Sequence, residues 1–134
     1  MAIIHWLGAG LSSAPGIKRL IGNGLELWLW NRTLSKAEAV IEDMEGQCQA
    51  RVLDWQKLHE NVSRGDIVVS MLPGSFHLQA AQLALDNKFD RLMKDAEIEV
   101  SNYQYDEAIK KFEEASALKP NNQQPKQLIR DVKR

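Results

Sequence analysis

The chain has 134 residues, of which 44% are hydrophobic and 26% are charged, and its formal net charge is −1. This composition is ordinary for a soluble globular protein with one compact domain, or with one small domain and an appendage. Because charges of both signs are mixed along the chain, the sequence argues against a basic surface for nucleic acid or for an anionic membrane. No apolar run approaches the ~18 residues of a membrane-spanning helix, so we expect no membrane span.

The cysteine and histidine content argues against disulfides and metal sites. Cys48 is the only cysteine, so no disulfide can form within the chain, which is typical of the reducing cytoplasm. We expect Cys48 to be a buried or half-buried small residue rather than a nucleophile. Because His5, His59 and His77 are not at the spacing of metal ligands, we expect no metal site.

Short apolar segments alternate with segments of helical composition in the first part of the chain. The first apolar run ends in glycines, which predicts a strand buried on both faces rather than a signal peptide. Strands that alternate with helices predict a parallel sheet with right-handed crossovers. We therefore predict an α/β fold with a four-stranded Rossmann-like sheet in the order 3-2-1-4. The predicted strands are residues 3–7, 25–30, 50–53 and 66–72, and the predicted helices between them are residues 17–21, 35–45 and 55–62.

The pattern changes after Gly74. Residues 75–119 contain no glycine or proline, and apolar residues recur every three or four positions from Leu78 to Val100. This spacing predicts one long helix over about residues 75–102.

Two further helices are predicted after it. The first covers residues 105–118, and a turn at residues 119–122 follows it. Pro125 suits the first turn of a last helix. We therefore divide the chain into a sheet domain, residues 1–86, and a helical hairpin with a capping helix, residues 87–134.

A glycine-rich turn directly follows the first predicted strand. Gly8, Ala9 and Gly10 stand between a strand and a helix, as in a dinucleotide-binding fingerprint. Gly8 permits a tight turn, and Gly10 lets a pyrophosphate approach the backbone amides at the helix start. Ser13 stands where the third glycine of the fingerprint normally falls, and we expect its hydroxyl to cap the helix or to contact phosphate. The alternative is a strand-to-helix turn that binds no ligand.

The end of the second predicted strand bears on the choice of cofactor. An acidic residue there would bind the ribose hydroxyls of NAD, but this chain has Asn31, Arg32 and Thr33. A carboxylate would repel a 2′-phosphate, whereas Arg32 and Thr33 can donate hydrogen bonds to it. The pattern favours NADP, with NAD as the alternative cofactor, unless this is a charged loop without a ligand.

The loop after the fourth predicted strand contains Leu72 and Pro73. In a sheet of this topology, that loop lies beside the ribose on the nicotinamide side of the cofactor. We expect His77, just beyond it, to lie at the surface or to cap the following helix rather than to contact the cofactor.

Three segments together resemble the N-terminal segment of the saccharopine dehydrogenase family: residues 4–11, residues 30–38 and residues 66–73. The resemblance covers about residues 2–86, and the Asn-Arg-Thr element is also similar to that of the β-hydroxyacid dehydrogenases. It implies pyridine-nucleotide-linked oxidation of an amino-acid adduct, with the substrate held mostly by a later domain that we expect this chain to lack. It implies cofactor contacts but no catalytic residue. The implied contacts are Gly8, Gly10, Leu11, Ser12, Asn31, Arg32, Thr33, Leu72 and Pro73.

Residues 89–122 resemble one tetratricopeptide repeat, and residues 123–134 resemble its capping helix. One repeat is too few to form the usual peptide groove, so we expect a structural cap rather than a peptide binder. The alternative is an ordinary antiparallel helical hairpin that closes the sheet. The residues at the small and bulky positions of the repeat are Leu92, Ala96, Tyr105, Ala108, Phe112, Ala115 and Pro120.

The two resemblances meet near residues 84–90 without a Gly/Pro/Ser linker, and the apolar stripe continues through this seam. This predicts a chimera in which one helix is shared, with no break at residues 86–90.

The sequence leaves three alternative functions open: a dinucleotide-binding domain, an engineered or recombined scaffold or interaction module without catalysis, and a complete enzyme. The scaffold would bind a protein partner or itself through the C-terminal helices, and no residue pattern supports the complete enzyme.

Overall fold

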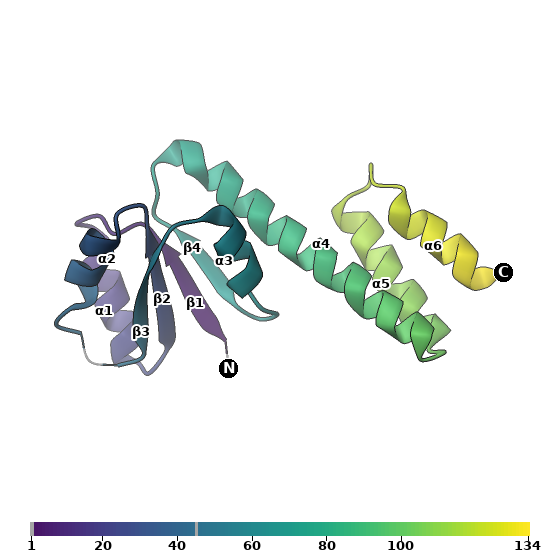
Figure 1. Ribbon diagram of the computed structural model, residues 1–134, viewed down its shortest axis with the longest axis horizontal. Coiled ribbons are helices and arrows are strands. Elements are labelled where there is room, and N and C mark those ends of the chain that lie inside the picture. The colour runs from purple at the N-terminus through teal and green to yellow at the C-terminus, as the bar shows by residue number, and fades with distance from the viewer. Residues whose placement is uncertain (1, 45) are drawn as a thin grey trace. The chain divides into compact units, whose positions relative to one another are not determined.

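The computed structural model of the chain describes residues 2–44 and 46–134. Its contacts divide the chain into two compact units, Met1–Ala84 and Leu85–Arg134 (Figure 1). The first unit contains two clusters of buried apolar side chains, and the second contains one.

The first unit is built on a four-stranded parallel sheet. Its strands are β1 (Ile3–Leu7), β2 (Glu26–Asn31), β3 (Cys48–Val52) and β4 (Ile67–Ser70), and they lie in the order β3-β2-β1-β4. The predicted fold class and strand order are therefore confirmed. All carboxyl ends of the strands lie at one edge of the sheet, since every neighbouring pair is parallel.

Three helices connect these strands. They are α1 (Ala14–Gly22), α2 (Leu34–Ile41) and α3 (Trp55–Asn61). The helix predicted over residues 35–45 ends at Ile41, and residue 45 lies outside the described part of the chain.

Helices cover both faces of the sheet, which explains why its central strands are mostly apolar. Ile4 and Trp6 of β1 pack in one buried cluster with residues of α1 and α2. Leu7, which follows Trp6 and faces the opposite side of the sheet, packs in a second cluster with Leu58 of α3. Alternate residues of a strand point to opposite faces, so a strand covered on both sides carries no polar alternation.

The second unit is a helical hairpin followed by a further helix. Helix α4 (His77–Ser101) begins in the first unit after a short 3₁₀ turn, η1 (Gly74–Phe76), and ends in the second. Helices α5 (Tyr105–Leu118) and α6 (Gln124–Lys133) follow. The core of this unit joins α4 and α5, and its buried residues are Phe89, Met93, Ala96, Ala108, Phe112 and Ala115.

The apolar stripe predicted along α4 is wrong in its first part. Leu78 is 78% exposed, whereas Ala80 and Leu83 are buried. The buried positions then resume at Phe89, out of phase with Leu83, so α4 does not bury one continuous stripe. The sequence contains apolar residues at helical spacing, but it does not show where the helix begins after the turn at Gly74–Phe76. The first residue of the helix determines which of its side chains face the sheet.

A buried polar network joins β1, β2 and the residue that precedes β4. The Trp30 indole donates a hydrogen bond to His5 Nδ1 at 3.1 Å, and His5 Nε2 lies 3.0 Å from Asp66 Oδ2. Because an indole N–H can only donate, His5 carries its proton on Nε2 and donates it to Asp66. The Asp66 carboxylate also accepts hydrogen bonds from the backbone amides of Ile3 and Ser63.

The charge of Asp66 makes this network sensitive to acid. Burial raises the pKa of the Asp66 carboxyl, but the hydrogen bonds from Ile3, Ser63 and His5 outweigh burial, and the pKa lies below its ordinary value. A lowered folded-state pKa stabilises the fold above the unfolded-state value, about 3.9, and this contribution is lost as the pH falls through the folded-state pKa.

We expect Asp66→Asn to lower the free energy of unfolding by about 1–3 kcal/mol at pH 7. Every partner of Asp66 is a donor, so the amide group of asparagine would set a donor against a donor. Urea unfolding from pH 7 to pH 3 would measure this, with the exposed Asp43→Asn as the control. The difference between wild type and Asp66→Asn should shrink at low pH, and a difference that stays constant with pH would contradict this account.

Candidate functional site: a pocket at the carboxyl edge of the sheet

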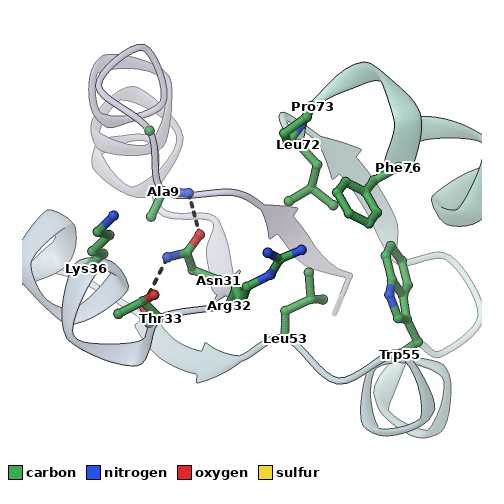
Figure 2. Close-up of a pocket in the computed structure, with 11 residues that line it drawn as sticks. Ala9, Asn31, Arg32, Thr33, Lys36, Leu53, Trp55, Leu72, Pro73 and Phe76 are labelled. Carbon is green, nitrogen blue, oxygen red and sulfur yellow. Dashed lines mark hydrogen bonds between the residues drawn. The ribbon is translucent and has the colours of Figure 1, made fainter.

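A cavity of about 540 Å³ opens where the strands of the first unit end (Figure 2). Its walls come from the glycine turn after β1, the end of β2 with the start of α2, the segment after β3, and the loop after β4. The lining residues are Ala9, Gly10, Asn31, Arg32, Thr33, Lys36, Leu53, Trp55, Leu72, Pro73 and Phe76. Of the nine predicted site residues, the pocket brings together Gly10, Asn31, Arg32, Thr33, Leu72 and Pro73.

The two glycines of the turn have different surroundings. Gly8 is buried with φ of +108°, and a Cβ there would lie 2.9 Å from the Met71 carbonyl oxygen. Gly8 also donates from its amide to the Trp30 carbonyl at 2.8 Å. Gly10 lines the pocket, and a Cβ there would meet nothing within 4 Å. Gly8 therefore holds the strand ends together, whereas Gly10 leaves the backbone open toward the cavity.

Three residues at the start of α1 lie outside the lining of the pocket. Leu11 is fully exposed, Ser12 is exposed, and Ser13 is buried. The Ser13 hydroxyl makes no capping hydrogen bond to α1, so the capping role expected of it is wrong. This buried hydroxyl has no hydrogen-bond partner among the described residues, and its contact with phosphate stays a prediction.

Asn31 connects two walls of the pocket. Its Oδ1 accepts a hydrogen bond from the Ala9 amide at 3.2 Å, and its Nδ2 donates to the Thr33 carbonyl at 3.0 Å (Figure 2). The side chain therefore sets the distance between the glycine turn and the loop after β2. Sequence reasoning predicted a ligand contact at Asn31 but not this bridging role.

Two cationic side chains line the pocket. The Arg32 guanidinium lies over the Phe76 ring, 5.6 Å from its centroid. Lys36 lies in the first turns of α2, across the pocket from Phe76 (Figure 2). Lys36 was not among the predicted site residues, although its position four residues after Arg32, on a predicted helix, was the available signal.

The apolar part of the lining was also missed in part. Leu53 and Trp55 follow β3, and Phe76 ends the turn after β4. Nothing in the local sequence distinguishes these residues from core residues. They follow strands at opposite edges of the sheet and line one cavity only in the folded chain.

The loop after β4 is closed by a side-chain contact at its base. Ser70 Oγ and His77 Nδ1 lie 2.8 Å apart. His77 is exposed and does not line the pocket, as predicted. The contact joins the end of β4 to the start of α4 and so limits the movement of Leu72, Pro73 and Phe76.

The surroundings of Cys48 agree with an inert thiol. Its side chain is half-buried, as predicted, and burial raises the pKa of the Cys48 thiol above its ordinary value. A thiol with a raised pKa is protonated at neutral pH and is a poor nucleophile.

Within residues 2–44 and 46–134, no helix combines the length and the apolar character needed to cross a membrane. Within the same ranges, no three His, Cys, Asp or Glu side chains are placed to hold a metal ion.

The lining residues fit a dinucleotide phosphate. Gly10 leaves the open backbone that a pyrophosphate needs, and Arg32 and Lys36 supply positive charge. Outside the lining, the buried Ser13 hydroxyl has no hydrogen-bond partner among the described residues. Pro15 in the first turn of α1 removes one amide donor, so this helix offers fewer donors to an anion than a helix without proline.

Comparison with known proteins assigns the family. The family model described as "saccharopine dehydrogenase NADP binding domain" matches residues 4–119. The chain belongs to this family. NADP is accordingly its cofactor, and the matched range extends to residue 119, past the end of α5.

Relatives of this NADP-binding domain are longer proteins. A glutamyl-tRNA reductase of Sulfurimonas denitrificans is 30% identical over 66% of the chain, and one of Mannheimia succiniciproducens is 31% identical over 58%. The matches cover 20% and 18% of those two proteins. The chain therefore spans about a fifth of the length of the curated relatives it matches.

A solved structure supports the fold. Apo saccharopine dehydrogenase (L-Glu forming) from Saccharomyces cerevisiae superposes with a TM-score of 0.56 at 24% identity, over 66% of this chain and 20% of that one. At this identity the likeness concerns the fold alone.

Proposed function

We propose that the pocket at the carboxyl edge of the sheet is the NADP site of this domain. The main support for this proposal is that Gly10 and Arg32, which follow different strands, line the same cavity. In addition, none of the described lining residues carries a carboxylate, which would repel the phosphates. The turn at Gly8 and Gly10, together with Leu11 and Ser12, would hold the pyrophosphate. Leu72 and Pro73 would lie beside the ribose on the nicotinamide side.

The preference for NADP over NAD would come from the end of β2. Arg32 and Thr33 would donate hydrogen bonds to the 2′-phosphate, and Asn31 would position them through its bridge to Ala9. Lys36 adds a second positive charge on the same wall. A 2′-phosphate gains from such charge-assisted hydrogen bonds, which the 2′-hydroxyl of NAD makes more weakly.

The reaction of the whole protein is proposed from the family. A bound nicotinamide would supply hydride transfer, and the substrate would be an amino-acid adduct held mostly by residues outside this sheet. We assign no catalytic residue in this chain. We also propose that the sheet domain comprises residues 1–86 and the helical domain residues 87–134. A cytoplasmic location, which is consistent with the single cysteine, is proposed as well.

Titration with NADPH and NADH tests the cofactor site directly. We expect saturable thermal stabilisation and a calorimetric binding heat with NADPH, and a weaker effect with NADH at the same salt concentration. A ligand that binds only the folded state stabilises it by mass action, so the shift should rise with the logarithm of ligand concentration. No shift with either ligand at millimolar concentration would overturn the proposal.

A second candidate function concerns the C-terminal unit. We infer that residues 87–134 form a tetratricopeptide-type hairpin with a capping helix, joined to the sheet as a chimera that acts as a scaffold or interaction module. A groove of about 440 Å³ lined by Val100, Phe112, Leu128 and Val132, among others, supports association through these helices. Concentration-dependent mass in light scattering would favour it, and a constant monomer mass would count against self-association.

A further inference from the structure

The NADP pocket has a polar side and an apolar side. Asn31, Thr33 and Lys36 line the side near the glycine turn, whereas Leu53 and Trp55 line the side beyond Arg32 (Figure 2). Phe76 completes the apolar side from the loop after β4. A dinucleotide has the same division, since its phosphates are charged and its adenine ring is flat and largely apolar on its faces.

Phe76 differs from three other apolar residues that line the pocket. Leu53, Trp55 and Leu72 pack against the buried cluster that contains Leu58. Phe76 is half-buried and, in the described part of the chain, belongs to none of the three core clusters. Its ring therefore contributes to the wall of the pocket without being required for the core.

The position of the Phe76 ring is set by the backbone around it. The Phe76 amide donates to the Pro73 carbonyl at 2.8 Å within η1, and Ser70 and His77 close the base of the loop. A ring held in advance on a short turn loses little conformational entropy when a ligand stacks on it.

The contact that Phe76 already makes shows what its face attracts. The Arg32 guanidinium, a flat cation, lies over the ring at 5.6 Å from the centroid. Guanidinium groups and nucleobases both stack on aromatic faces, because each is planar and is attracted by the ring electrons.

We propose that Phe76 provides the aromatic face on which the adenine ring of the cofactor stacks, with Arg32 withdrawing from Phe76 to cover the outer face of the base and reach the 2′-phosphate. This inference rests on the proposed NADP site and adds the residue that recognises the base. Without a base, Arg32 occupies the Phe76 face in its place. Trp55, which is half-buried against the core cluster of Leu58, forms the edge of the adenine site rather than its platform.

Cofactor fragments separate adenine stacking from the rest of the site. Adenosine 2′,5′-bisphosphate contains the adenine, the 2′-phosphate and the 5′-phosphate on the adenosine side of the cofactor, and reduced nicotinamide mononucleotide contains no adenine. We expect Phe76→Ala to weaken calorimetric binding of the bisphosphate and of NADPH roughly tenfold to a hundredfold, as for the loss of one base–aromatic stack. Binding of the mononucleotide should change less than twofold.

Three variants make the result specific. Phe76→Tyr keeps the aromatic face and should bind NADPH like the wild type, whereas Phe76→Leu keeps the apolar volume but should bind as weakly as Phe76→Ala. Tyr103→Ala removes an aromatic ring that is 80% exposed in the other unit and should change nothing. Thermal unfolding of each variant shows that it is folded, and Phe76→Leu decides the case if Phe76→Ala unfolds.

Different binding results would overturn adenine stacking on Phe76 and the NADP site itself. If the wild type binds the bisphosphate and both Phe76→Ala and Phe76→Leu bind it equally well, adenine stacking on Phe76 is overturned while the NADP site stands. An equal loss for the bisphosphate and the mononucleotide would also overturn it, because Phe76 would then only shape the cavity. A wild type that binds neither NADPH nor the bisphosphate overturns the NADP site and this inference together.

Discussion

Replacing Gly8 with alanine is expected to lower the free energy of unfolding by about 3 kcal/mol or more, a large fraction of the ~5–15 kcal/mol that stabilises a typical domain. Two costs combine at this position. Its φ of +108° lies in a region that L residues rarely adopt, which costs about 1–3 kcal/mol. The new Cβ would also lie 2.9 Å from the backbone carbonyl oxygen of Met71, which cannot turn away as a side chain could.

Urea unfolding measures this effect, and Gly10→Ala is the matched control. A Cβ on Gly10 meets nothing within 4 Å, so its variant should unfold within about 0.5 kcal/mol of the wild type. Equal stability of Gly8→Ala and Gly10→Ala would show that the loop after β4 moves away from the turn, contrary to the structure described above.

Arg32→Ala is expected to weaken NADPH binding by roughly tenfold to a hundredfold and NADH binding by much less. A hydrogen bond to a charged group contributes about 1.5–3 kcal/mol, and the 2′-phosphate is the part of NADP that NAD lacks. Calorimetric titration of both cofactors at fixed salt gives the ratio of the two affinities. That ratio should fall toward one in the variant.

Two variants accompany this measurement. Arg64→Ala removes an exposed arginine that does not line the pocket and should leave both affinities unchanged. Gly10→Val should weaken both cofactors together, because its branched side chain fills the approach to the backbone. If neither Arg32→Ala nor Gly10→Val alters binding, the glycine turn is only a structural feature and the cofactor binds elsewhere.

The sheet of this protein could be predicted from sequence because its signals are local. A strand covered on both faces is built mainly from apolar residues, as in residues 3–7, where only His5 is polar, and a glycine must follow where the backbone takes a positive φ, as at Gly8. The right-handed crossover rule then leaves few strand orders, and the observed order β3-β2-β1-β4 is the expected one. The cofactor class followed from the same residues, since the glycine turn and Arg32 are both local motifs.

Other parts of the site were decided only by the tertiary structure. Leu53, Trp55 and Phe76 reach one cavity because the parallel strands end at one edge, and no local pattern marks them as different from core residues. Leu78 had the spacing of a core residue and is exposed, because the start of α4 after η1 determines which residues of the helix are buried. The sequence by itself therefore determined the strands, their order and the cofactor class, which depend on backbone sterics and burial. Only the tertiary structure decided which side chains line the pocket, because that depends on contacts between residues far apart in the chain.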